Sequence, residues 1–117
     1  MKNLNNLSKE IHAGNKQRGF WDGERNVGEL LMLVVSELGE AIEAHRKNRF
    51  TDPAAPKFEI NPEYFAEHIK DTFEDEIADS IIRLFDMCGG LGIDIDFHIR
   101  EKLKYNETRP IKHGKRY

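Results

Sequence analysis

Two pairs of carboxylates are the residues in this sequence whose type and spacing are best suited to chemistry. Glu37 and Glu40 lie three residues apart in one helix-favouring stretch. Glu76 and Asp79 repeat that spacing in a second stretch. At about 100° per residue, each pair shares one face of its helix. Glu37 and Glu76 both border apolar sectors, where an unpaired charge is costly, so a cation is expected to meet them.

The chemistry of these side chains favours a magnesium or manganese site. Four converging carboxylates without histidine or cysteine suit Mg²⁺ or Mn²⁺ better than zinc. A di-iron bundle would need Glu-x-x-His on two helices, and Asp79 occupies the corresponding position here. The alternative is an ordinary solvated acidic face, which single pairs of this kind usually mark. Two pairs that both border apolar sectors favour the metal site.

A second set of polar residues near the C-terminus could bind phosphate. Lys102, Asn106 and Arg109 follow the spacing i, i+4 and i+7, so they form one stripe along a helix. Lysine supplies a point charge and arginine can bind two oxygens at once, which suits a phosphate chain. The alternative is a basic face favoured by the dipole at a helix C-terminus.

Two residues near the N-terminus are candidates for contacts with a nucleoside. Trp21 follows Phe20 in the glycine-flanked run GFWDG, where its ring could stack on a nucleobase. His12 could contact a sugar or a phosphate. A core role for Trp21 and a structural role for His12 are the alternatives.

Helices must position all of these residues, and the sequence predicts an all-helical chain. Helix-favouring residues dominate, and no stretch alternates polar and apolar residues as a strand would. Four helices are expected. Their predicted bounds are about 3–17, Asn26 as a cap to near Asn48, Pro62 through Phe85 toward Gly89-Gly90, and a cap at Asp94 or Asp96 to Arg109 before Pro110.

The length of 117 residues predicts a single domain, spanning 1–117. An irregular loop is expected at about 49–61, and an irregular basic tail at about 110–117. The net charge is −3, but residues 101–117 carry six Lys and Arg against two Glu. An acidic body with a basic end suits a phosphate ligand held between cations and an acid-bound metal.

Several classes of protein are excluded or disfavoured. The longest apolar run, residues 30–35, is far shorter than the roughly 20 residues of a membrane-spanning helix. The start of the chain lacks the apolar stretch of a secretion signal, and the one cysteine, Cys88, cannot form an intrachain disulfide. A cytoplasmic location is therefore expected. A nucleic-acid binder is not favoured, because the body is acidic and no aromatic residues interleave with the basic ones.

Together these motifs resemble the MazG-like, all-α nucleoside triphosphate pyrophosphohydrolase superfamily, whose signature is E-x-x-E on one helix and E-x-x-D on the next. The likeness covers about residues 12–109. It includes the GFW run, RNVGELLMLVVSELGEAIEA, EDEIADSIIRLFD and KLKYNETRP. The loop at 49–61 is longer than in compact members, and the tail after Pro110 extends beyond the shared core.

The resemblance implies a four-helix MazG-like bundle whose core is completed by a homodimer or homotetramer. It also implies that the four acidic residues hold Mg²⁺ and that Lys102 and Asn106 contact the triphosphate. The expected reaction is metal-dependent hydrolysis of a (deoxy)nucleoside triphosphate to the monophosphate and pyrophosphate, in nucleotide-pool house-cleaning. One of the four carboxylates, with Glu37 as a candidate, would accept the proton of the attacking water.

Two alternatives to this function stay open. A phosphoribosyl-ATP pyrophosphohydrolase would use the same acidic helices on a different substrate. A non-catalytic, nucleotide-sensing helical module would keep the acidic residues only to bind a cation.

Overall fold

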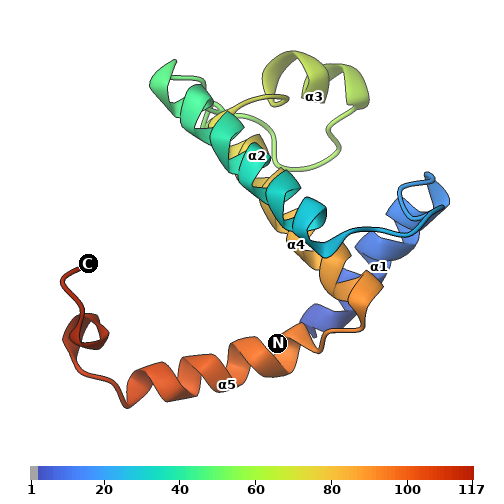
Figure 1. The fold of residues 1–117 in the computed structure, drawn as a ribbon. Coiled ribbons are helices and arrows are strands. Elements are labelled where there is room, and N and C mark those ends of the chain that lie inside the picture. Colours follow the sequence, from blue (N-terminus) through green and yellow to red (C-terminus); the bar gives the residue numbers. More distant parts are fainter. Residues whose placement is uncertain (1–2) are drawn as a thin grey trace. The chain divides into compact units, whose positions relative to one another are not determined.

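The computed structural model describes residues 3–117, which form helices, turns and loops without a strand. The prediction of an all-α fold is confirmed. Within the described residues, no helix is long and apolar enough to cross a membrane. The helices are α1 (Leu4–Gln17), α2 (Val27–Arg46), α3 (Pro62–His68), α4 (Phe73–Leu91) and α5 (Ile95–Glu107), followed by a 3₁₀ turn at Ile111–Gly114 (Figure 1).

Polar side chains cap the helices where the sequence predicts. The Asn26 side chain accepts a hydrogen bond from the backbone N–H of Glu29 at 3.0 Å, and so starts α2. Asp94 accepts from the N–H of Phe97 at 3.0 Å and starts α5. Each cap satisfies an N–H group that has no partner within its helix.

The single helix predicted from Pro62 onward is wrong, because the chain breaks between α3 and α4. Asp71 adopts a left-handed backbone with φ of 65°. The Thr72 hydroxyl then accepts the N–H of Asp75 at 3.3 Å and donates to the Ile69 carbonyl at 2.7 Å. The apolar spacing continues across this turn, which is why periodicity alone did not reveal it. The described residues therefore contain five α-helices instead of the four predicted.

The predicted end of this helix at Gly89-Gly90 is also wrong. Helix α4 continues through both glycines to Leu91, and Gly92 adopts the left-handed conformation, with φ of 69°. The N–H of Ile93 closes the end by donating to the Cys88 carbonyl at 2.9 Å. This is the usual geometry of a helix that ends at a glycine.

Gly89 serves a different purpose, since it permits a close approach of two helices. A Cβ atom at this position would lie 2.7 Å from the Cβ of His12 and 2.9 Å from the Ser8 carbonyl oxygen, both in α1. Such contacts are too short for any side chain. Gly89 is therefore required for α1 to pack against the end of α4.

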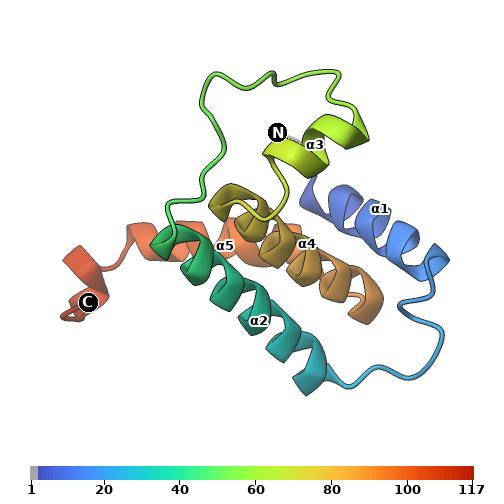
Figure 2. The same ribbon diagram turned by 90° about the horizontal axis from the view of Figure 1, so that it is seen from above.

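The contacts divide the chain into two compact units. One unit comprises residues 19–84, which include α2, α3 and the larger part of α4. Within it, α2 and α4 lie side by side in both ribbon views (Figures 1 and 2). The other unit comprises residues 1–18 and 85–117. There α1 contacts α5, and the N–H of Leu4 donates to Asp96 at 3.1 Å.

The predicted irregular segments are observed. Residues 49–61 contain turns and no helix, and Pro62 begins α3 after the Asn61 cap. The tail from Pro110 forms the short 3₁₀ turn, in which Lys112 and His113 have positive φ angles. This irregular geometry agrees with the sequence.

Replacing Thr72 with valine removes the hydroxyl that caps α4 and keeps the shape of the side chain. We expect the free energy of unfolding to fall by about 1–2 kcal/mol, because the cap and a buried hydrogen bond are lost. Urea unfolding followed by circular dichroism measures the change. Thr108→Val is the control, since it removes an exposed hydroxyl that donates to the Tyr105 carbonyl. Equal losses in the two variants would contradict the capping role.

Candidate metal centre

Helices α2 and α4 run antiparallel, and this arrangement brings the two acidic pairs together. At one end of the pairing, the N–H of Phe73 donates to the carbonyl of Arg49 at 2.8 Å. Further along, Nε of Arg83 donates to Oε1 of Glu37 at 2.9 Å. These two contacts fix the register, so Glu37 of α2 faces the first turns of α4.

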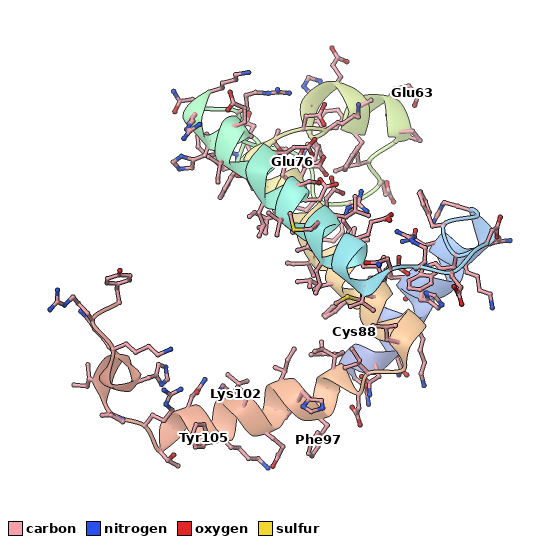
Figure 3. The ribbon with its side chains drawn as sticks, viewed as in Figure 1. Glu63, Glu76, Cys88, Phe97, Lys102 and Tyr105 are labelled. Atoms are coloured by element: carbon pink, nitrogen blue, oxygen red, sulfur yellow. The ribbon has the colours of Figure 1, made fainter. Side chains whose placement is uncertain are left out.

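Three of the four predicted carboxylates converge closely. One oxygen from each of Glu37, Glu76 and Asp79 lies within 4.8 Å of the others. Glu40 is exposed and lies close enough to Glu76 to raise the pKa of that carboxyl. The structure thus brings the two i, i+3 pairs together around Glu76. Figure 3 shows Glu76 where α2 and α4 lie side by side.

Glu76 is the most deeply buried member of the cluster. Only 4% of its surface is exposed, compared with 8% for Glu37. Its Oε2 atom is buried and accepts no hydrogen bond from any donor among residues 3–117. A buried carboxylate without a donor is destabilising unless it is neutralised by a proton or by a cation.

The pKa values of the cluster reflect the cost of burying charged carboxylates. Burial raises the pKa of Glu76 to about 8, and the carboxylates of Glu40 and Glu37 add to the increase. Burial also raises the pKa of Asp79, helped by the charges of Asp75 and Glu37. Without a cation, Glu76 is therefore protonated at neutral pH.

Glu37 differs from its neighbours because it has a cationic partner. Burial acts to raise its pKa, but the hydrogen bond and the charge of Arg83 act against this, with help from Glu40 and Glu76. The net result is a pKa below the ordinary value of 4.5. Glu37 is therefore ionised at neutral pH, and its Oε1 is held in place by Arg83.

The donor set fits a hard divalent cation. Both groups of described residues that could share an ion consist of Asp and Glu alone. The second group is formed by Asp71, Asp75 and Glu76, and so it extends the first through Glu76. Carboxylate oxygens without nitrogen or sulfur ligands are typical of Mg²⁺ and Mn²⁺ sites.

An open cavity of about 270 Å³ adjoins the buried carboxylate. It lies between the C-terminal part of α2 and the start of α4. Its lining residues are Glu40, Glu43, Ala44, Arg49, Asp71 and Glu76. The cavity gives a ligand access to the acidic cluster.

The predicted phosphate stripe lies on α5, in the other compact unit. The Lys102 ammonium and the Arg109 guanidinium lie 5.2 Å and 5.5 Å from the centre of the Tyr105 ring. Figure 3 labels Lys102 and Tyr105 on α5. Both cations therefore contact the same aromatic ring. Asn106 has a buried Oδ1 atom without a hydrogen-bond partner among the described residues. The role of these residues in binding phosphate stays a prediction.

The two nucleoside-contact candidates have partners within the chain. The Arg25 guanidinium lies 5.5 Å from the centre of the half-buried Trp21 ring. Nδ1 of His12 lies 2.9 Å from Asp86, which also accepts a hydrogen bond from Asn15 at 3.0 Å. The contacts of His12 agree with a structural role in packing α1 against α4. Contacts of either residue with substrate stay predictions.

Sequence reasoning missed Arg83, which determines the charge of Glu37. A signal was present, because Arg83 lies seven residues after Glu76 and four after Asp79. These spacings place it on the same face of α4 as both acids. Extending the acidic stripe by one further turn would have included Arg83 as a candidate partner for an acid, without showing that the acid is Glu37.

Comparisons of the chain with protein-family models, with curated proteins and with solved structures found no match. The resemblance to the MazG-like superfamily therefore rests on the residues described above.

The raised pKa of Glu76 predicts how the stability of the metal-free protein depends on pH. The pKa is 4.5 in the unfolded chain and about 8 in the folded one, so the folded protein binds more protons between these values. The contribution of this group is fully present below about pH 4.5 and is lost as the pH rises through about 8. Glutamine cannot titrate, so Glu76→Gln should lose less stability over this range than the wild type.

Urea unfolding in EDTA across this pH range measures the difference. Glu63→Gln serves as the control, since Glu63 is exposed on α3 (Figure 3). Parallel pH profiles for the wild type and Glu76→Gln would contradict the assignment.

Proposed function

We propose that this chain hydrolyses nucleoside triphosphates, with deoxynucleotides as the expected class, to the monophosphate and pyrophosphate. The reaction would depend on Mg²⁺ or Mn²⁺ and would serve to cleanse the nucleotide pool. The supporting observation is the buried Glu76 carboxyl, whose Oε2 has no partner among the described residues and which lies beside Glu37 and Asp79. A cation bound there would meet the phosphates of a nucleotide that enters the adjoining cavity.

Glu37, Glu40, Glu76 and Asp79 would hold the ion. A divalent ion in such a site neutralises phosphate charge and lowers the pKa of a coordinated water. The ion pair with Arg83 keeps Glu37 ionised. A low pKa suits a metal ligand and weakens Glu37 as the acceptor of a proton from water.

The remaining candidate residues would contact the substrate. Lys102, Asn106 and Arg109 would stabilise the charge that develops on the departing pyrophosphate. Trp21 would stack on the base, and His12 would contact the sugar or a phosphate. In an oligomer, these contacts could cross a subunit boundary.

We further propose that the active form is a homodimer or homotetramer, because α2 exposes an apolar stripe. Its residues follow the spacing of one helix face, and all are at least 43% exposed. They are Val27, Leu31, Val35, Leu38 and Ile42. A continuous apolar face of this kind normally marks an interaction site. The stripe lies beside the buried face of α2, so a second copy would extend the existing core.

Pyrophosphate release from a panel of dNTPs and NTPs, with phosphoribosyl-ATP included, tests the activity. We expect turnover with Mg²⁺ or Mn²⁺ and none in EDTA, because the carboxylates alone repel phosphate. Glu40→Ala and Asp79→Ala should each lower kcat/KM by at least about 100-fold, the usual effect of losing a metal-site contact.

Glu10→Ala, in the exposed part of α1, is the matched control and should retain full activity. Circular dichroism checks that the helices remain. Full activity in both metal-site variants would contradict the proposed function. Turnover of phosphoribosyl-ATP alone would identify the alternative enzyme, and nucleotide binding without pyrophosphate release would identify the sensing module.

The oligomeric state is tested by size-exclusion chromatography with light scattering. We expect a mass of two or four times the 13.6 kDa of one chain. Val35→Lys should shift the protein toward the monomer, because it places a charge in the apolar stripe. Ser36→Lys is the control, since Ser36 is exposed on α2 outside the stripe. A monomeric wild type would rule out the assembly.

A further inference from the structure

The cavity beside Glu76 has one cationic side chain in its lining, and that residue has no part in the metal cluster. Among the described residues that line it, Glu40, Glu43, Asp71 and Glu76 are acidic, whereas Arg49 carries a positive charge. A nucleotide that enters this cavity brings several negative charges toward four carboxylates. A divalent ion can offset part of this repulsion, and Arg49 is placed to offset more of it.

The backbone of Arg49 is held from both sides. Its N–H donates to the Ala44 carbonyl at 2.9 Å, which ties it to the end of α2. Its carbonyl accepts the N–H of Phe73 at 2.8 Å, which ties it to the start of α4. Although it lies in a segment without regular structure, Arg49 therefore has a fixed place at the cavity.

The two residues that follow continue this attachment. The Phe50 ring packs edge-on against the Phe73 ring, with centroids 5.9 Å apart. The N–H of Thr51 donates to Oε1 of Glu74 at 2.9 Å. We call residues 49–51 the strap, because their hydrogen bonds and the Phe50 ring contact join the end of α2 to the first turn of α4. The strap is fixed by its backbone and by Phe50, so the guanidinium of Arg49 is not needed to hold it.

The guanidinium itself has no ion-pair or hydrogen-bond partner among residues 3–117. Other arginines in the same unit are paired within it, as Arg83 is with Glu37 and Arg46 is with Glu43. Arg49 is exposed and lines an acidic cavity, yet it makes no such bond. Its donors are therefore available to a ligand. The planar fork of an arginine matches two oxygens of a phosphate.

We propose that Arg49 binds the phosphate chain of the nucleotide in this cavity, which it lines together with Glu76 and Glu40 of the acidic cluster. This inference rests on the proposed function and adds to it a phosphate-binding residue. The phosphate chain would lie between two positive charges, the divalent ion on the side of Glu76 and the guanidinium on the side of the strap. A nucleoside without phosphates would gain nothing from Arg49.

Equilibrium binding tests the inference separately from catalysis. The probes are Mg²⁺ with inorganic pyrophosphate, and Mg²⁺ with a deoxynucleoside triphosphate whose α–β bridging oxygen is replaced by NH. We expect Arg49→Gln to weaken both by about tenfold or more, the usual worth of a charged hydrogen bond. Arg49→Lys should recover part of the affinity, because it restores the charge without the fork.

Two controls separate phosphate binding from effects on the fold or on the ion. Arg46→Gln removes an exposed arginine from the last turn of α2, where it pairs with Glu43, and should change binding by less than about twofold. Binding of Mn²⁺ alone to Arg49→Gln should be equal to or tighter than that of the wild type, since a nearby positive charge is removed. A thermal melt checks that the strap stays folded.

The outcomes distinguish this inference from the proposed function. If the wild type releases pyrophosphate and Arg49→Gln keeps wild-type affinity and KM, the role of Arg49 is wrong and the function stands. If the wild type shows no turnover but binds pyrophosphate through Arg49, the hydrolysis is wrong and the phosphate site stands. If the wild type neither binds the probes nor hydrolyses a triphosphate, both are wrong.

Discussion

The burial of the Glu76 carboxyl between two antiparallel helices is the constraint on which the rest of this site depends. Carboxylates on α2 and α4 repel each other, yet the apolar faces beside them bring the helices together. Arg83 neutralises Glu37, but Glu76 keeps a buried oxygen without a donor among the described residues. The protein can satisfy that atom with a proton, as its raised pKa indicates, or with a cation. If a cation binds there as proposed, the same carboxyl would couple protonation, stability and metal binding.

The strap at residues 49–51 explains how this geometry is maintained. It ties the last turn of α2 to the first turn of α4 at the end of the helix pair nearest the acidic cluster. The exposed Glu74 accepts a hydrogen bond from Thr51 and so has a structural role. One set of backbone contacts therefore fixes the register of the carboxylates and the position of Arg49. Metal and phosphate would then be bound by parts of the chain that these hydrogen bonds join.

The exposed apolar side chains of α2 also bear on the stability of the protein. Few large apolar side chains are buried among the described residues, whereas the stripe from Val27 to Ile42 is exposed. Leu30 and Val34 face the inside of the chain on the neighbouring side of the same helix. The apolar sector of α2 is thus wider than its buried face. Burial of this stripe by a second copy would add hydrophobic stabilisation that the single chain does not obtain.

The sequence by itself determined the helical fold, the cap at Asn26 and the two acidic pairs, because these depend on spacing along one helix. It left Asp94 and Asp96 open as the cap of α5, and the structure decides for Asp94. The sequence did not reveal the break at Asp71, because a turn held by the side chains of Thr72 and Asp75 leaves the apolar spacing intact. The apolar sectors beside Glu37 and Glu76 indicated that these two carboxylates are buried. Only the tertiary structure decided that Glu76 keeps an oxygen without a donor among the described residues, that Glu37 pairs with Arg83, and that Arg49 lines the cavity. These features depend on the register between α2 and α4. That register is set by contacts between residues distant in the sequence, which helical periodicity does not encode.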